Sequence, residues 1–127
     1  MRHRYTLKKT ERLKSRQRIE TLFREGKRFS LFPLKVFYLP GPPAPVPLQA
    51  GVGVSSRLFR KAVDRNRIKR LMREAWRTQR HILSDHLGKK GLSMTVFLIY
   101  AGKELPDYPA VTQKIGLTLQ KLVRETA

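Results

Sequence analysis

The stretch that decides the fold runs from residue 64 to residue 77 and reads DRNRIKRLMREAWR. It carries five arginines and one lysine against one aspartate and one glutamate. At about 100° per residue, one side of this stretch is suited to a hydrophobic core. Continued beyond residue 77, that side comprises Ile68, Leu71, Met72, Ala75, Gln79 and Ile82. The spacing predicts a helix over about residues 62–83 that packs on a sheet.

The charged side chains gather on the opposite side of this helix and form what we call the basic ridge. It comprises Asn66, Lys69, Arg70, Arg73, Arg77 and Arg80, with Arg65 and Arg67 on its flanks. At the rise of an α-helix the ridge is about 20 Å long. Only Asp64 and Glu74 compensate it from within the helix, although like charges at this spacing repel. A solvated face is the alternative, but the excess charge favours an external polyanion, which guanidinium groups bind through paired hydrogen bonds.

The composition of the whole chain agrees with a nucleic acid as the partner. With 28 Lys and Arg against 9 Asp and Glu, the 127 residues carry a formal net charge of +19. A hydrophobic fraction of 40% suits one packed domain over residues 1–127 and argues against a disordered basic tail. Clustered Lys and Arg bind nucleic acids by releasing counterions from phosphates. The ridge carries few of the short polar side chains that read bases, which favours a folded RNA over the DNA major groove.

Several other kinds of partner are disfavoured by what the sequence lacks. Cysteine is absent, which excludes disulfides and thiolate metal sites and fits a cytoplasmic location. The apolar runs are too short to cross a bilayer, and the basic first residues are not followed by the apolar region of a secretory signal. We therefore expect neither a membrane nor a small-molecule substrate as partner.

The remaining segments predict an α+β domain. Ser15 can cap a helix of about residues 16–25 that Gly26 ends. Residues 29–40 favour extended structure, which Pro33 breaks or places at a sheet edge. The further expected segments are a mobile basic arm over 1–14, a stiff, exposed Pro-rich hairpin connection over 40–47, a strand near 50–55, a turn through Gly88 and Gly91, a central strand near 93–102, and a last helix entered through Pro106 and Pro109.

The sequence offers no catalytic centre of its own. Hydrolysis of a phosphodiester by a protein-bound metal needs clustered carboxylates, and the nine acids are spread along the chain. Glu25 and Lys27 have a spacing found in nucleases, but they end a helix and lack an acidic partner. His3, His81 and His86 lack the spacing of metal ligands. We therefore expect no catalytic residue and no metal ligand in the protein, which would supply binding.

Several motifs of the sequence resemble the bacterial ribonuclease P protein component. AVDRNRIKRLMREAWR (62–77) is similar to the signature of that family, an RNR followed by a basic helix. RLKSRQRIETLFREGKR (12–28) resembles its first helix, GVGVSS (51–56) its glycine-and-valine strand, and LSMTVFLIYA (92–101) its last strand. The resemblance covers residues 7–122, and its RNR-with-helix motif is highly specific.

The resemblance implies a fold and a function. The fold would be an α+β two-layer sandwich like the second domain of ribosomal protein S5, in the order α-β-β-β-α-β-α, with a left-handed βαβ crossover. The protein would be a subunit of the ribonucleoprotein endonuclease that removes the 5′ leader from precursor tRNA. Its partners would be the catalytic RNA and the precursor tRNA. The cofactor would be Mg²⁺, held mainly by the RNA, which performs the hydrolysis.

The family motif and the helical geometry together assign residues to a surface for the catalytic RNA. Those that match the motif are Arg65, Asn66, Arg67, Lys69, Arg70 and Arg73, and the geometry adds Arg77 and Arg80. Asn66 could instead satisfy a backbone group locally. Trp76, at the border of the apolar side, is expected to pack in the core rather than stack on a base.

The resemblance also implies a cleft between the first helix and the sheet that holds the single-stranded leader. Its expected residues are Ile19, Phe23, Lys35, Phe37, Ser55 and Arg57. Stacking of a base on Phe contributes about 1–3 kcal/mol without demanding a sequence. The apolar pattern alone also allows Phe23 in the core.

Two features of the expected cleft depart from the family pattern. Ile19 stands where the family often has an aromatic residue. The loop SSRLFRKAV (55–63) is one residue longer than usual and offers Arg57, followed by Arg60, in place of a second lysine. Both departures bear on how strongly the cleft holds a leader.

Two functions of other classes remain open at this point. A ribosomal or assembly protein would co-purify with ribosomal RNA particles rather than with one RNA of ribonuclease P size. A DNA-binding regulator would bind duplexes sequence-selectively in the presence of competing structured RNA.

Overall fold

The structure is a computed structural model that describes residues 11–127. In chain order the elements are α1 (Arg16–Glu25), β1 (Lys27–Leu31), β2 (Leu34–Gly41), β3 (Leu48–Val54), α2 (Ala62–Gln79), α3 (His81–Lys90), β4 (Ser93–Tyr100) and α4 (Tyr108–Glu125). The fold is α+β, and the expected order α-β-β-β-α-β-α holds, with α2 and α3 in the place of the one long helix.

The strands form one mixed sheet in the order β1-β2-β4-β3. β2 is antiparallel to both of its neighbours, β1 and β4, whereas β3 is parallel to β4. β4 is central, as its two apolar faces predict. The parallel pair is joined by a crossover through α2 and α3. The left-handed sense of that crossover stays a prediction of the family resemblance.

The prediction of a hairpin connection over residues 40–47 is wrong. β4 lies between β2 and β3, so the connection from Gly41 to Leu48 passes the end of β4 instead of joining neighbours. Pro40 and Gly41 still belong to β2, where they pair with Met94 and Ser93. Beyond Tyr38, β2 pairs with β4 alone, the edge-like setting in which a proline is tolerated.

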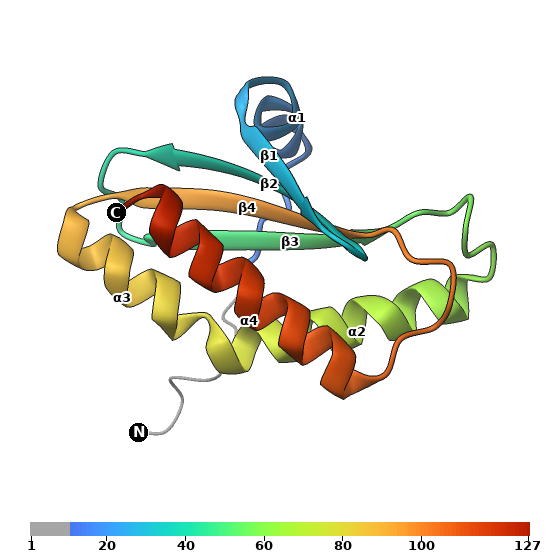
Figure 1. Cartoon of the computed structure of the whole chain (residues 1–127). Helices are drawn as coiled ribbons and strands as arrows, with labels where there is room; N and C mark the ends of the chain where they lie inside the picture. Colours follow the sequence, from blue (N-terminus) through green and yellow to red (C-terminus); the bar gives the residue numbers. More distant parts are fainter. Residues whose placement is uncertain (1–10) are drawn as a thin grey trace.

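Helices α2, α3 and α4 cover one face of the sheet, and α1 lies on the other (Figure 1). Between the sheet and α2–α4, the buried core draws on Val36, Val96 and Leu98 from the strands and on Ile68 and Ile115 from the helices. Burying each such side chain stabilises the fold by about 1.5–3 kcal/mol. Trp76 belongs to this core with 2% of its surface exposed, which confirms that it packs.

The predicted long helix is interrupted. α2 ends at Gln79, Arg80 forms the joint, and α3 continues to Lys90. The Gln79 amide nitrogen donates to the carbonyl oxygens of Ala75 and of Thr112 on α4, at 3.2 and 3.1 Å, and so ties the end of α2 to α4.

The interruption changes which side chains reach the core. Ile82, expected on the buried side, is 42% exposed, while Leu83 and Leu87 are fully buried. The expected turn also moves, because Gly88 lies within α3. Gly91 alone ends the helix, at a left-handed φ of 67° that suits glycine.

The end helices form as the sequence predicts. Ser15 caps α1 by accepting a hydrogen bond from the backbone N–H of Arg18, and Gly26 ends the helix. Asp107 caps α4, which buries Val111, Ile115, Leu119 and Leu122. The extended stretch around Pro33 is two strands, β1 and β2, that meet at the turn Phe32–Pro33.

Residues 11–14 are not a mobile arm. Arg12 makes a parallel bridge with Ala50, and the Leu13 N–H donates to the Ala50 carbonyl at 2.9 Å. Leu13 is buried, with 4% of its surface exposed. The edge of β3 carries backbone groups that need partners, and this segment supplies some of them. The rest of the expected arm, residues 1–10, lies outside the described residues.

Candidate nucleic-acid interface

The outer face of the sheet, opposite α2–α4, carries rows of side chains that the strand pairing aligns. Arg28, Phe37, Phe97 and Gly51 are direct partners across the sheet and form one row. The next row consists of Ser30, Lys35, Ile99 and Gly53. Cross-strand partners point to the same side of a sheet, so aromatic and cationic groups share this face.

Three phenylalanines meet on this face, and we call them the aromatic cluster. Phe23 of α1 lies 4.7 Å from Phe37 and 5.3 Å from Phe97, measured between ring centroids. The Phe23 side chain is 42% exposed, and α1, which carries it, lies on the side of the sheet away from α2–α4 (Figure 1). Exposed rings held in a fixed arrangement can stack on unpaired bases.

Phe97 is the cluster member that the sequence prediction missed. Its ring covers β3, because a Cβ on Gly51 would lie 2.8 Å from two of its ring carbons and one on Gly53 would lie 3.0 Å from another. The signal was present in the sequence: glycines alternate along GVGV, and Phe97 alternates with core residues in the central strand. Only the strand pairing shows that these two patterns face each other.

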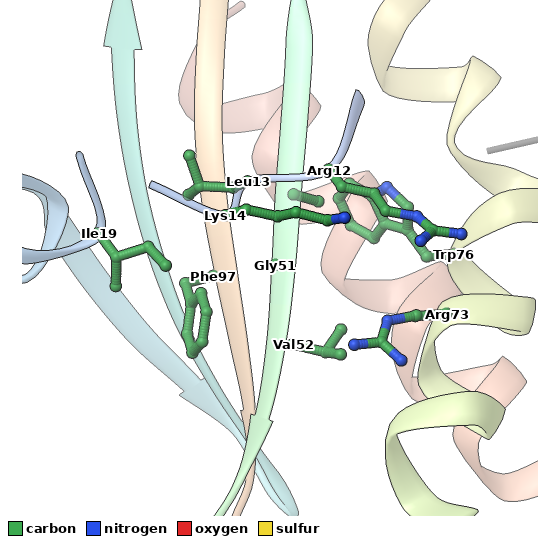
Figure 2. Close-up of a pocket in the computed structure, with 10 residues that line it drawn as sticks. Arg12, Leu13, Lys14, Ile19, Gly51, Val52, Arg73, Trp76 and Phe97 are labelled. Atoms are coloured by element: carbon green, nitrogen blue, oxygen red, sulfur yellow. The ribbon is translucent and has the colours of Figure 1, made fainter. Parts of the chain in front are cut away.

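The other residues expected in the cleft are spread along this face. Ile19 and Phe97 line one cavity, which Figure 2 shows beside β3. Lys35 and Phe37 line a second depression with Arg28. Ser55 follows the end of β3, where its hydroxyl accepts a hydrogen bond from the Leu58 N–H at 3.4 Å.

The loop after β3 also carries Arg57 and Arg60, and both are exposed. The structure therefore brings Ile19, Phe23 and Phe37 near Phe97, and it places Ser55 and Arg57 at the end of β3.

The central residues of the basic ridge stand together on α2. Asn66, Lys69, Arg70, Arg73 and Arg77 line one shallow depression, together with Glu74 and Arg12. Asn66, Arg70 and Arg73 are exposed. Arg77 forms an ion pair with Glu74. The hydrogen bond between them raises the pKa of Arg77 and lowers the pKa of Glu74. One of the ridge's cations is thus neutralised locally.

The three outlying arginines of this helix differ from one another. The Arg65 guanidinium donates to the carbonyl oxygens of Phe59 and Arg60, both at 2.8 Å, and so braces the loop before α2. Arg67 is exposed. Arg80 does not extend the ridge, because it lies at the joint after Gln79 and pairs with Glu11 at 2.8 Å, with 11% of its side chain exposed.

Arg12 adds a cation that the sequence prediction had left in the mobile arm. It lines both the depression on the ridge and the cavity beside β3, and Arg73 does the same. In Figure 2 the charged ends of Arg12, Lys14 and Arg73 extend into the space between β3 and α2. Partial burial, and then the charge of Arg12, lower the pKa of Arg73.

A comparison with known protein families shows to which family this chain belongs. The family model described as Ribonuclease P matches residues 7–123. The chain belongs to the ribonuclease P protein family. Members of this family are the protein subunit of a ribonucleoprotein endoribonuclease and have roles in RNA binding and in tRNA 5′ processing.

Two curated relatives agree with this assignment along most of their length. The ribonuclease P protein component of Porphyromonas gingivalis is 39% identical over 119 residues, which cover 93% of this chain and 87% of the relative. That of Desulfovibrio desulfuricans is 31% identical over 121 residues, covering 95% and 89%.

Solved structures of the ribonuclease P protein share the fold. The protein from Thermotoga maritima superposes with a TM-score of 0.69 at 23% identity, covering 87% of this chain and 96% of that one. The protein from Staphylococcus aureus gives 0.59 at 20% identity, covering 91% and 94%. At these identities the likeness establishes the architecture.

The acidic and histidine side chains of this ribonuclease P protein are dispersed. Within residues 11–127, no group of three or more His, Cys, Asp or Glu side chains is placed to hold a metal ion. In the same part of the chain no helix is long and apolar enough to span a bilayer. The donor set that Mg²⁺ prefers, clustered carboxylates, is thus not assembled by the described residues.

Proposed function

We propose that this protein binds the catalytic RNA of ribonuclease P through the basic ridge and the precursor tRNA leader over the aromatic cluster. The observation that carries the proposal is the separation of the two surfaces. Cations that few carboxylates offset lie on α2, and partly exposed phenylalanines lie on the outer face of the sheet. The protein would act in the cytoplasm, where tRNA precursors are made.

The basic ridge suits the backbone of a folded RNA. The residues that we assign to it are Arg65, Asn66, Arg67, Lys69, Arg70, Arg73 and Arg77. Of these, Lys69, Arg70 and Arg73 form no ion pair with a carboxylate within residues 11–127, whereas Arg77 pairs with Glu74 and Arg65 braces a loop. We assign the direct phosphate contacts first to Lys69, Arg70 and Arg73, because guanidinium and ammonium groups without partners have most to gain from a phosphate.

The outer face suits an unpaired strand of varied sequence. Stacking on an aromatic ring contributes about 1–3 kcal/mol per base and is tolerant of sequence, because every base has a π-face. Phe23 and Phe37 offer rings, and Lys35 and Arg28 stand nearby on the same face to attract the backbone. We place Ser55 and Arg57 at the end of this path, beyond the last residue of β3.

The chemistry is assigned to the RNA. Reactions of this family are RNA-catalysed and generally depend on Mg²⁺. The described residues of the protein do not gather the carboxylates that would hold that ion. What the protein contributes is positive charge next to RNA phosphates, which lowers the repulsion that Mg²⁺ must otherwise offset.

The experiment is a reconstituted cleavage assay with precursor tRNA and the partner RNA, titrated with Mg²⁺ with and without the protein. We expect the protein to lower the Mg²⁺ concentration at which the leader is removed. Equal cleavage by the RNA alone and by the mixture at low Mg²⁺ would show the proposal to be wrong. Lysozyme, a basic protein of similar size, controls for unspecific effects of positive charge.

A further inference from the structure

Residues 11–14 extend the sheet beyond β3. Arg12 bridges to Ala50 in the parallel sense, the Leu13 N–H donates to the Ala50 carbonyl at 2.9 Å, and the Leu13 side chain is buried. Leu13 also comes within 3.0 Å of where a Cβ on Gly51 would lie, through its carbonyl oxygen. This close approach fixes the segment against the strand and places Arg12 beside α2.

The ion pair between Glu11 and Arg80 anchors the start of this segment. Its oxygen and nitrogen lie 2.8 Å apart, and the two side chains are 19% and 11% exposed. The pairs Arg24–Glu25 and Lys121–Glu125 are much more accessible, with exposures of 67% and 58% and of 32% and 40%. Breaking a partly desolvated pair costs more than breaking an exposed one, since the remaining charge loses its partner in a poorly hydrated place.

The anchored segment brings two like charges together. Arg12 and Arg73 line the same cavity, and Arg12 helps to lower the pKa of Arg73. Lys14 extends into the same space (Figure 2). No Asp or Glu lines this cavity within the described residues, and the sequence of residues 1–10 contains neither. Glu74 lines the neighbouring depression with Arg12 and Arg73, but it pairs with Arg77. An anion from outside the chain would therefore supply the missing negative charge.

We propose that Arg12 and Arg73 bind one phosphodiester group between them, and that the Glu11–Arg80 ion pair positions Arg12 for this contact. The assignment rests on the proposed function for the identity of the polyanion. Two guanidinium groups can share one phosphate through charge-assisted hydrogen bonds. The site lies between the ridge and the aromatic cluster, since Arg73 belongs to the former and Phe97, which lines the same cavity, to the latter.

The first experiment uses inorganic phosphate and the free protein. The thermal unfolding midpoint is measured against phosphate concentration at constant ionic strength for the parent, Arg12→Ala, Arg73→Ala and the double variant. We expect each single variant to lose part of the phosphate-dependent rise, and the double variant to lose no more than the larger single loss. Arg124→Ala on α4 removes the same charge elsewhere and is expected to keep the full rise.

Two results of this experiment would overturn the site. Either the single variants respond to phosphate as the parent does, or the losses of the two variants add in full, which would indicate two independent anions. Because no RNA is present, this outcome does not depend on whether the protein functions in ribonuclease P.

The second experiment identifies the source of the phosphodiester. Affinity for the catalytic RNA alone and affinity of the holoenzyme for precursor tRNA with and without leader are measured for the same variants. A loss of about tenfold is expected where the phosphate binds. A loss for the RNA alone assigns the phosphate to the catalytic RNA, and one restricted to leader-bearing substrate assigns it to the leader. Unchanged affinities in all arms would overturn the RNA contact.

The positioning role of Glu11 is tested by exchange of charges. Glu11→Gln is expected to reduce the phosphate response as Arg12→Ala does, although Glu11 carries a negative charge and its loss should otherwise favour anion binding. The double variant Glu11→Arg with Arg80→Glu restores a pair of opposite charges and is expected to restore the response. An increased response in Glu11→Gln, or no recovery in the exchanged variant while it stays folded, would contradict the role.

Discussion

Arginines of the same helix have different roles according to the oxygen atoms within their reach. Arg65 donates to two loop carbonyls, Arg77 pairs with Glu74, and Arg80 pairs with Glu11. Arg70 and Arg73 stay accessible on the ridge. A guanidinium that gives up a hydrogen bond to an internal partner in order to bind phosphate gains less than one without such a partner. The net contribution to RNA binding should therefore differ from one arginine to another.

Glu74→Gln is expected to strengthen RNA binding. The change removes the carboxylate that neutralises Arg77 and keeps the shape of the side chain, so one more cation becomes available to phosphate. The log–log slope of affinity for the catalytic RNA against salt should become steeper by about one. Asp85→Asn, an equivalent change at an exposed position of α3, controls for the added net charge. A weaker affinity in Glu74→Gln would indicate that Glu74 positions Arg77 for the RNA.

Phe23→Ala is expected to weaken binding of leader-bearing precursor tRNA by about 1–3 kcal/mol, the contribution of one stacked base. Binding of mature tRNA by the same holoenzyme should change little, because the ring packs against Phe37 and Phe97, and α1 lies on the opposite face of the sheet from α2. Equilibrium binding of the two substrates gives the comparison, and the circular dichroism of the variant verifies its fold. Equal losses for both substrates would argue against a leader site at Phe23.

At the scale of elements, the ridge functions because α2 buries one side against the sheet and α4. Ile68, Met72, Ala75 and Trp76 fix the rotation of the helix, so the opposite side cannot turn away from solvent. The side chain of Gln79 then ties the end of α2 to α4, and the chain bends into α3. The bend ends the ridge near Arg77.

Arg70→Ala is expected to reduce the salt slope of binding to the catalytic RNA by about one, with a lower affinity at every salt concentration. Arg124→Ala, exposed near the end of α4, removes the same charge and should leave the slope unchanged. Equal slopes for the parent and Arg70→Ala would place this part of the ridge in solvent.

Gly51→Ala is expected to destabilise the protein by about 1–3 kcal/mol, as overpacking does. A Cβ here would lie 2.8 Å from two ring carbons of Phe97 and 3.0 Å from the Leu13 carbonyl oxygen, so both the aromatic cluster and the edge segment must move. Gly88→Ala is the matched control, since nothing lies within 4 Å of its Cβ and it sits in α3. Urea unfolding should show that Gly88→Ala is more stable than the parent protein by about 0.5–1 kcal/mol.

At the scale of the whole molecule, the net charge of +19 sets a general condition on stability. The cations of α2 and of the edge segment are held close together by the fold, and they separate when the chain unfolds. Repulsion of this kind favours the unfolded state, and counterions or a bound polyanion reduce it.

The urea midpoint is therefore expected to rise with sodium chloride between about 0.02 and 0.3 M, the range over which the Debye length falls from beyond 20 Å to below 6 Å. The same series with sucrose in place of salt controls for solute effects that do not depend on charge. A midpoint that stays flat or falls with salt would show that internal pairs, such as Glu11–Arg80, already balance the repulsion.

The sequence predicted much of the architecture through local signals. Ser15 and Gly26 bound α1 because capping is decided by neighbouring residues, and the two apolar faces of residues 94–99 predict the central position of β4 in the sheet. The same signals fail across long separations. The passage of residues 42–47 around β4 and the docking of residues 11–14 on β3 depend on which strands become neighbours.

The sequence alone determined that a cationic helix packs on a sheet and that the chain matches the ribonuclease P protein family, because periodicity and motif are properties of consecutive residues. Tertiary structure alone decided that Phe97 joins Phe23, that Arg80 leaves the ridge for Glu11, and that Arg12 comes to Arg73. Each of these contacts joins segments distant in the chain. The physical reason is that packing distances, unlike spacing in sequence, are fixed only when the sheet and helices have assembled around a common core.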